Sequence, residues 1–168
     1  KDLNILNNRE IVSYCKSNKI DFVVVGPEAP LANGLIDILI QNKILCFGPT
    51  KEAALLESSK SFTKSICDKR NIPTANYVIA NSKKEALGFI EKFKPPFVIK
   101  LDGLAAGKGV FISKNKSEAI NTINDIYGNR DKNNTILIEE FLKGIEASLF
   151  IISNGYKYKS LGTAQDYK

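Results

Sequence analysis

Histidine, methionine and tryptophan are all absent from this chain of 168 residues, and cysteine occurs only three times. Without histidine, the chain can form neither a Cys/His zinc site nor a histidine-based catalytic triad. Cys15, Cys46 and Cys67 stand far apart and form no Cys-x-x-Cys pair. So sparse a set indicates a reduced, cytoplasmic protein rather than a disulfide framework.

Long apolar runs are also missing. The apolar stretch 34–40 is interrupted by Asp37 and is far shorter than the roughly 18 residues that indicate a membrane-spanning helix. The N-terminus lacks the apolar core of a signal peptide. Because position 1 is lysine and no methionine occurs anywhere, we expect the chain to be an interior portion of a longer protein.

The formal net charge of +6 raises the question of a nucleic-acid partner. The lysines are spread along the chain, however, with no arginine cluster and no basic run interleaved with aromatic residues. A diffuse positive field suits phosphorylated small molecules equally well. We therefore expect small-molecule ligands, with no nucleic acid and no membrane as partners.

Helical and strand patterns alternate along the chain, which favours an α/β or α+β protein. A helix over 9–18, a strand over 21–25, a helix over 31–42 and a strand over 44–47 form a βαβ unit. The strand at 21–25 is apolar on both faces, as expected for a buried parallel strand. Residues 1–58 therefore resemble the end of a doubly wound sheet.

The pattern of predicted helices and strands changes near residues 50–60. Thr50 can cap one helix and the pair Ser58-Ser59 the next, and Ser82 and Asn115 head two later ones with a glutamate three residues on. Strands are predicted at 77–79, 97–100, 110–112, 135–138, 147–152 and 156–158, with a polar loop at 128–134 and a turn at 153–155. The resulting β-α-β-β-α-β order predicts a small lid over residues 73–140 within a second domain, 59–168.

The segment 97–113 carries the most specific signal. An apolar run ends in Lys100, a loop with Gly103, Gly107, Lys108 and Gly109 follows, and a second apolar run comes directly after. Glycines allow positive φ and a close approach of the backbone, and lysines beside them suit a polyphosphate. The loop is one residue short of a Walker A loop and precedes a strand, so it predicts a phosphate-covering hairpin. An ordinary glycine-rich turn with solvated lysines is the alternative.

Three further places could contact a ligand. Glu139, Glu140, Phe141 and Leu142 join one strand to the next, where backbone groups can read a purine edge, although a solvated linker would look the same. Glu146 could accept hydrogen bonds from ribose hydroxyls. The triplet 26–28 (Gly-Pro-Glu) lies at the carboxyl end of a strand, where doubly wound sheets bind ligands, although a simple turn would also explain it.

These features together resemble the ATP-grasp fold. More narrowly, seven segments in colinear order resemble the phosphoribosylamine–glycine ligase (glycinamide ribonucleotide synthetase) family; they are 25–31, 48–50, 59–60, 72–74, 102–109, 138–142 and 164–166. The resemblance implies the end of a pre-ATP-grasp domain, the lid, and the start of the larger ATP-grasp lobe. It also implies that ATP, glycine and 5-phosphoribosylamine give glycinamide ribonucleotide, ADP and phosphate through a glycyl phosphate, in purine biosynthesis.

The resemblance also implies roles for individual residues. Lys60 and Lys100 would hold the ATP phosphates under the 103–109 loop, residues 140–142 would hold adenine, and Glu146 would hold the ribose. The residues implied to lie near phosphoribosylamine and glycine are Gly26, Pro27, Glu28, Asp166 and Lys168. Where the family usually has histidine after the aspartate of its Gln-Asp pair, this chain has Tyr167.

The family's magnesium ligands would follow Lys168, so the resemblance implies ATP and Mg²⁺ as cofactors but no metal ligand within this chain. We therefore expect residues 1–168 by themselves to be inactive, and the protein to be a monomer. Two rivals stay open: another ATP-grasp carboxylate–amine or carboxylate–thiol ligase, and a nucleotide-binding module without catalysis.

Overall fold

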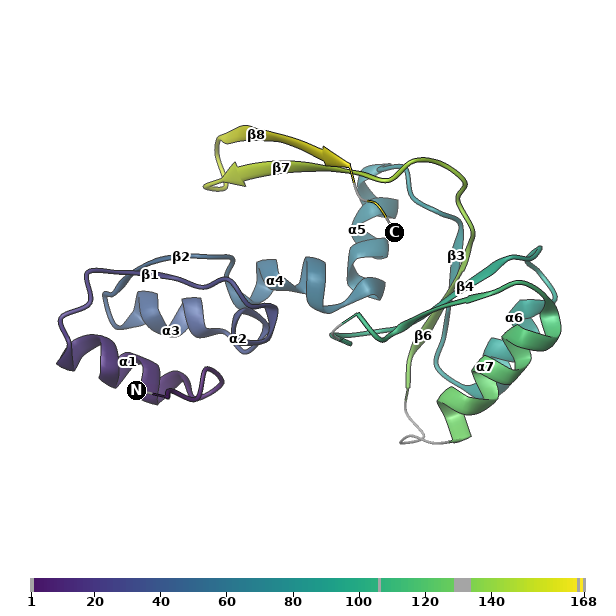
Figure 1. Ribbon diagram of the computed structural model, residues 1–168, viewed down its shortest axis with the longest axis horizontal. Helices are drawn as coiled ribbons and strands as arrows, with labels where there is room; N and C mark the ends of the chain where they lie inside the picture. Colours follow the sequence, from purple (N-terminus) through teal and green to yellow (C-terminus); the bar gives the residue numbers. More distant parts are fainter. Residues whose placement is uncertain (1, 106, 129–133, 166, 168) are drawn as a thin grey trace.

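The computed structural model describes residues 2–105, 107–128, 134–165 and 167. Two helix-and-sheet units lie at opposite ends of an elongated molecule, joined by two helices, and a long hairpin extends beside the junction (Figure 1). The predicted mixture of α/β and α+β structure is confirmed. Within the described residues, no helix is long and apolar enough to cross a membrane.

The N-terminal unit contains a parallel two-stranded sheet with helices beside it. Its elements are α1 (Asn8–Ser17), β1 (Phe22–Val24), α2 (Glu28–Ala32), α3 (Leu35–Gln41) and β2 (Leu45–Phe47). Strand β1 pairs in parallel with β2, with Val23 opposite Cys46, so the predicted βαβ unit is confirmed. A core forms between the sheet and the helices from Val12, Cys15, Val25, Leu35, Ile36 and Leu39.

Two expectations for this unit were wrong. Strand β1 is not buried on both faces, because α1 and α3 lie on one side of the sheet (Figure 1) and leave Phe22 and Val24 exposed on the other. The predicted helix over 31–42 is two helices, α2 and α3. Gly34 separates them in the left-handed conformation, with φ of 79°, which a continuing helix does not allow.

Two consecutive helices, α4 (Lys51–Ser58) and α5 (Lys60–Arg70), lead to the second unit. Both begin at the predicted caps: Thr50 Oγ1 accepts from Ala53 N at 3.4 Å, and Ser59 Oγ accepts from Phe62 N at 3.2 Å. Helix α5 ends at Arg70, and its C-cap residue Asn71 adopts φ of 53°. Local side-chain capping therefore determines where the chain changes direction between the units.

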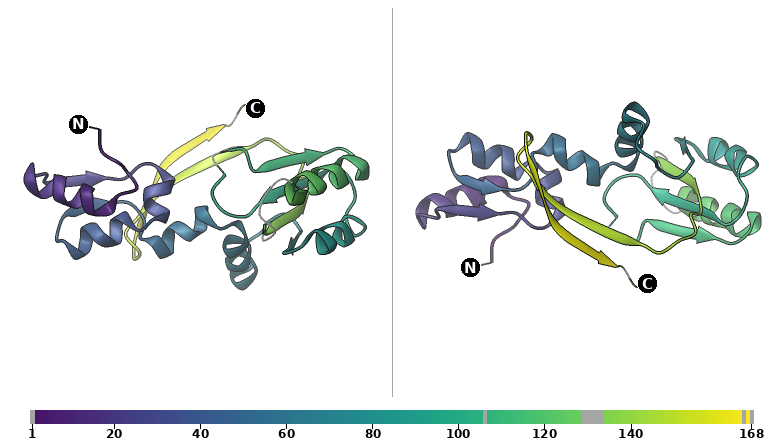
Figure 2. Two further views of the ribbon diagram at one scale, coloured as in Figure 1. Left: turned by 90° about the horizontal axis from the view of Figure 1, so that it is seen from below. Right: turned by 90° about the horizontal axis from the view of Figure 1, so that it is seen from above.

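The second unit is a four-stranded antiparallel sheet with two helices on one face (Figures 1 and 2). Its elements follow the predicted order: β3 (Tyr77–Ala80), α6 (Lys83–Ile90), β4 (Phe97–Leu101), β5 (Val110–Ser113), α7 (Lys116–Gly128) and β6 (Ile136–Glu140). The strands lie in the order β3-β6-β4-β5. Phe97, Ile99 and Leu101 are buried in the core with α6 and α7. Because side chains alternate along a strand, Lys100 points to the opposite face.

The last two strands form a hairpin whose residues are all exposed. Strand β7 (Ala147–Ser153) pairs antiparallel with β8 (Tyr158–Gln165), with a register shift between Phe150 and Ile151. The final strand predicted at 156–158 was misplaced. It begins only at Tyr158 and runs to Gln165, because pairing with β7 continues along its whole length.

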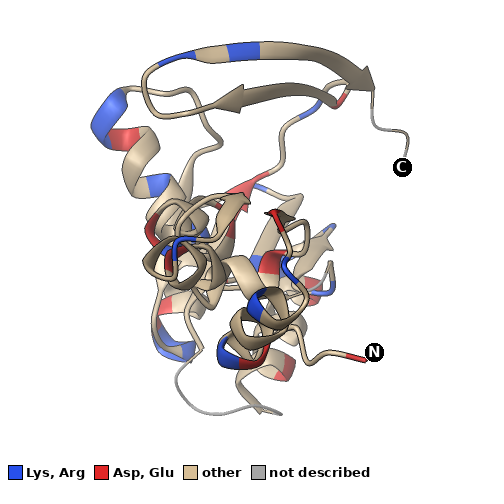
Figure 3. Cartoon of the chain, turned by 90° about the vertical axis from the view of Figure 1, so that its left-hand side faces the viewer, with Lys and Arg blue, Asp and Glu red and all other residues tan. Residues whose placement is uncertain are grey.

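Charged residues are distributed over both units and the hairpin. Lys and Arg segments are interspersed with Asp and Glu segments in the described part of the chain (Figure 3). The expected diffuse distribution of positive charge is therefore what the fold displays. The division at residues 58 and 59 and the lid limits 73–140 stay predictions.

Candidate functional site

The glycine loop joins β4 to β5, so the prediction of a strand after the loop, rather than a helix, is confirmed. Gly103 and Gly107 have φ of 89° and 75°, in the left-handed region that favours glycine. Gly109 is required for a different reason, because a Cβ there would lie 2.5 Å from the Cβ of Ala105. Ala106 lies outside the described residues. The loop thus contains glycine where its backbone geometry requires it.

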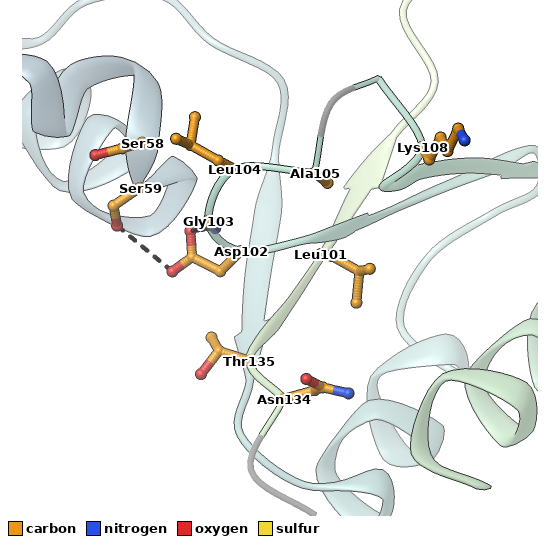
Figure 4. A pocket seen from close by; sticks show the side chains of 10 residues that line it. All are labelled: Ser58, Ser59, Leu101, Asp102, Gly103, Leu104, Ala105, Lys108, Asn134 and Thr135. Atoms are coloured by element: carbon orange, nitrogen blue, oxygen red, sulfur yellow. Dashed lines mark hydrogen bonds between the residues drawn. The ribbon is translucent and has the colours of Figure 1, made fainter. Parts of the chain in front are cut away.

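Asp102 ties the start of this loop to the beginning of α5. Its carboxylate accepts hydrogen bonds from the backbone N–H groups of Lys60 at 2.7 Å, Ser61 at 3.2 Å and Gly103 at 2.9 Å, and from the Ser61 hydroxyl. A longer contact to the Ser59 hydroxyl is drawn in Figure 4. Burial raises the pKa of Asp102, but these hydrogen bonds outweigh it and leave that pKa below its usual value.

The side chain of Lys60 reinforces this attachment. Its Nζ donates to the carbonyl oxygen of Gly103 at 2.8 Å. Lys60 therefore lies directly against Gly103, the first glycine of the loop. Lys60 thus donates twice to the start of the loop, from its backbone N–H to Asp102 and from its side chain to Gly103.

Lys100 lies on the sheet face away from α6 and α7, where its Nζ donates to Glu139 Oε2 at 2.8 Å. The other carboxylate oxygen of Glu139 lies 3.4 Å from the Nζ of Lys64, which also donates to Thr74 Oγ1 at 2.7 Å. Lys64 is not among the site residues predicted from the sequence. The available signal was its place one helical turn after Lys60, on the same face of α5.

Two adjoining cavities contain most of the predicted phosphate site. One, of about 320 Å³, is lined by Leu56, Glu57, Lys60, Thr63, Lys64, Thr74, Lys100, Val110 and Glu139. The other, of about 380 Å³, is lined by Glu28, Ala29, Glu57, Lys60, Gly103, Leu104, Ala105, Gly107, Gly109 and Val110. Lys60 lines both. The structure therefore brings Lys60, Lys100, Glu139, Glu28 and three loop glycines to one region.

Lys108 is exposed and lies elsewhere on the loop. It lines a cavity of about 520 Å³ together with Ser58, Asp102 and Thr135, shown in Figure 4. This cavity includes neither Lys60 nor Lys100 among its lining residues. The structure thus does not bring Lys108 together with the other two lysines predicted to bind phosphate.

The predicted purine-binding connection begins later than expected. Glu139 and Glu140 belong to strand β6, because Glu139 pairs with Val98 and Glu140 with Phe97 of β4. Glu140 Oε1 accepts from Asn76 N at 2.8 Å, and Glu140 N donates to Asn76 O at 3.0 Å. The Glu140 carboxylate thus already accepts a hydrogen bond from the backbone of Asn76.

Phe141 and Leu142 are in the connection itself and are exposed. Leu142 and Glu146 line a further cavity, of about 590 Å³, whose lining consists of residues 142–148. Gly26 and Pro27 follow β1 as predicted, and Pro27 is the N-cap of α2. Asp166 and Lys168 lie outside the described residues, so their predicted substrate contacts stay predictions.

Comparison with known proteins gives the family. The sequence matches the N domain of phosphoribosylglycinamide synthetase over residues 1–57 and the ATP-grasp (A) domain of the same protein over residues 58–168. The chain belongs to the phosphoribosylglycinamide synthetase family. The resemblance drawn from the seven segments is therefore confirmed.

The relatives are longer than this chain. It is 42% identical over 168 residues to the phosphoribosylamine–glycine ligase of Agrobacterium fabrum, covering 99% of the chain and 40% of the relative. It is 42% identical to the trifunctional purine biosynthetic protein adenosine-3 of Gallus gallus, covering 99% of the chain and 17% of the relative. A crystal structure of phosphoribosylamine–glycine ligase from Thermotoga maritima superposes with a TM-score of 0.71 at 33% identity, over 88% of the chain and 37% of that structure. The chain thus spans less than half the length of these family members.

Proposed function

We propose that this chain binds ATP and takes part in the ATP-dependent ligation of glycine to 5-phosphoribosylamine, giving glycinamide ribonucleotide, ADP and phosphate. The observation that carries the proposal is the convergence of Lys60, Lys100 and the glycine loop on adjoining cavities. They belong to a chain 42% identical to a phosphoribosylamine–glycine ligase. The family membership favours this reaction over that of another ATP-grasp ligase.

In this proposal, Lys60 and Lys100 neutralise the phosphates of ATP and hold them in position. Phosphoryl transfer depends more on positioning, charge stabilisation and exclusion of water than on a side-chain nucleophile, so it does not require the histidine that this chain lacks. The glycine loop closes over the phosphates. The glycine carboxylate takes the transferred phosphoryl group, and the amine of phosphoribosylamine then attacks the resulting acyl phosphate.

The remaining contacts in this proposal are those that the family resemblance implies. Glu28 lines the cavity next to the loop, which supports a contact between residues 26–28 and the substrates. Phe141 and Leu142 hold the adenine ring, and Glu146 holds the ribose. Asp166 and Lys168 contact the substrates. A monomeric state and a cytoplasmic location are part of the same proposal.

Magnesium is the cation that such a reaction uses to bridge the β- and γ-phosphates of ATP. In the part of the chain that the structure describes, no group of three or more Asp, Glu, Cys or His residues could hold a metal ion. We propose that its ligands come from beyond Lys168, and no step above depends on it.

The test of nucleotide binding uses Lys100→Ala in the protein expressed from its complete gene. Loss of a hydrogen bond to a charged group is expected to weaken ATP binding by about 1.5–3 kcal/mol, measured by calorimetry. The matched control is Lys94→Ala, since Lys94 is exposed and lines none of the cavities around Lys60. An unchanged ATP Kd for Lys100→Ala would remove Lys100 from the site. Phosphate release that needs neither glycine nor phosphoribosylamine would instead contradict the proposed ligation.

A further inference from the structure

Lys64 is a buried lysine on α5, with only 8% of its surface exposed. Its ammonium donates to Thr74 Oγ1 at 2.7 Å and to the carbonyl oxygen of Ala75 at 3.2 Å, and it lies 5.0 Å from the centre of the Tyr77 ring. Burying an ammonium is costly unless it is paired and hydrogen-bonded. Its charged partner is Glu139, whose Oε1 lies 3.4 Å away.

Glu139 lies between two lysines. Its side chain is 5% exposed and contacts Lys64 through Oε1 and Lys100 through Oε2. The two ammonium groups carry two positive charges against one negative charge, so the cluster retains one positive charge. Lys100 is the more exposed of the two lysines, with 28% of its side chain accessible, and both line the cavity of about 320 Å³. The surplus charge is therefore presented beside Lys60.

We propose that Lys64 is a positioning residue for the polyphosphate. By holding one oxygen of Glu139, Lys64 prevents this carboxylate from neutralising Lys100 one to one. Glu139 can then orient the Lys100 ammonium through its other oxygen. A lysine ammonium has three N–H donors, so Lys100 can donate one to Glu139 and others to phosphate oxygens.

This proposal depends on the proposed function, because it assigns a task to Lys64 only if Lys100 contacts phosphate. A purely structural task is the alternative, since Lys64 also joins α5 to the segment that precedes β3. The two differ in what they predict for ligands with and without phosphates. If Lys64 tunes the charge of Lys100, its loss lowers the affinity for ATP and leaves the affinity for adenosine unchanged. A distorted site lowers both affinities.

The test compares Lys64→Met, Glu139→Gln and the double variant in the protein expressed from its complete gene. Calorimetry measures the Kd of a non-hydrolysable ATP analogue and of adenosine, and circular dichroism confirms folding. Lys64→Met is expected to weaken the ATP analogue about tenfold or more, because Glu139 then neutralises Lys100. Adenosine affinity is expected to stay unchanged. The matched control is Lys69→Met, since Lys69 is an exposed lysine on the same helix.

The double variant provides the decisive comparison. Without the negative charge of residue 139, nothing neutralises Lys100 when Lys64 is removed. The affinity of the double variant for the ATP analogue is therefore expected within about threefold of the wild type. Equal losses of ATP analogue and adenosine in Lys64→Met would overturn the proposal, as would an unchanged affinity for both. If Lys64→Met alone does not fold, the double variant decides, and a tenfold loss there counts against the proposal.

These results separate the two proposals. If the wild type binds no ATP analogue, or if Lys100→Ala binds it normally, the proposed function fails. If Lys100→Ala weakens binding but Lys64→Met does not, only the task of Lys64 is wrong.

Discussion

Replacement of Asp102 tests how the glycine loop is held. The Asp102 carboxylate accepts the backbone N–H groups of Lys60 and Ser61, and Ser59 accepts that of Phe62, so the two side chains together cap the first turn of α5. Loss of a capping side chain costs about 0.5–2 kcal/mol. A negative charge at a helix N-terminus adds about 0.3–1 kcal/mol. Asp102→Ala is therefore expected to lower the free energy of unfolding by about 1–3 kcal/mol.

Asp102→Asn separates the charge from the hydrogen bonds. It keeps an acceptor oxygen, so it is expected to cost only the charge contribution of about 0.3–1 kcal/mol. Because hydrogen bonds hold the pKa of Asp102 below its usual value, its ionised form stabilises the fold above the unfolded pKa of about 3.9. That contribution is lost as the pH falls through the lower, folded-state pKa. The difference between the wild type and Asp102→Asn should therefore shrink in acid.

Urea denaturation followed by circular dichroism, repeated from neutral to acidic pH, measures both effects. Asp125→Ala is the control, because Asp125 is an exposed aspartate on α7. An Asp102→Ala variant within about 0.5 kcal/mol of wild type would refute the capping argument, since that is the range of ordinary surface substitutions. If the difference in unfolding free energy between the wild type and Asp102→Asn persisted unchanged in acid, the assigned role of the charge would be refuted.

Three further predictions concern the loop and the hydrogen bond between Tyr77 and Asp68. Amide exchange in residues 103–109 is expected to slow when a non-hydrolysable ATP analogue is added, and equal exchange with and without it would contradict closure of the loop. Gly109→Ala is expected to displace the loop and weaken ATP binding because the new Cβ collides with that of Ala105, and Ala105→Gly in the same protein should restore binding. Tyr77 should titrate only near pH 12, because its hydroxyl donates to Asp68 at 2.5 Å. The stability that the neutral Tyr77 hydroxyl contributes is then present below about pH 10 and lost as the pH rises through 12. If the tyrosinate absorbance of the wild type minus that of Tyr77→Phe titrated near pH 10, this prediction would be contradicted.

The sequence predicted best what depends on neighbours in the chain. The caps at Thr50, Ser59 and Ser82 were found because each side chain bonds a backbone N–H three residues on. The position of Lys100 at the end of a strand and the hairpin around the glycine loop were also correct. Each of these signals is local, so no knowledge of the tertiary fold was needed.

What the sequence did not predict depends on distant partners. Glu139 was assigned to a connection, but pairing with β4 extends β6 to include it. The burial of Lys64 is decided by Glu139 and Thr74, which both lie outside α5. The open face of β1 was missed for the same reason, since an apolar strand looks alike whether one or both faces are covered.

The two hydrophobic cores determine how the chain unfolds. One contains Cys15 and residues from α1 to α3, the other contains residues from β3 to β6, and the two clusters have no described residue in common. Such cores can open as separate cooperative units, so a single melting temperature would average two events. Because Cys15 is buried in the first core, the labelling rate of its thiol would report the opening of that core. Circular dichroism would follow the loss of helices in both.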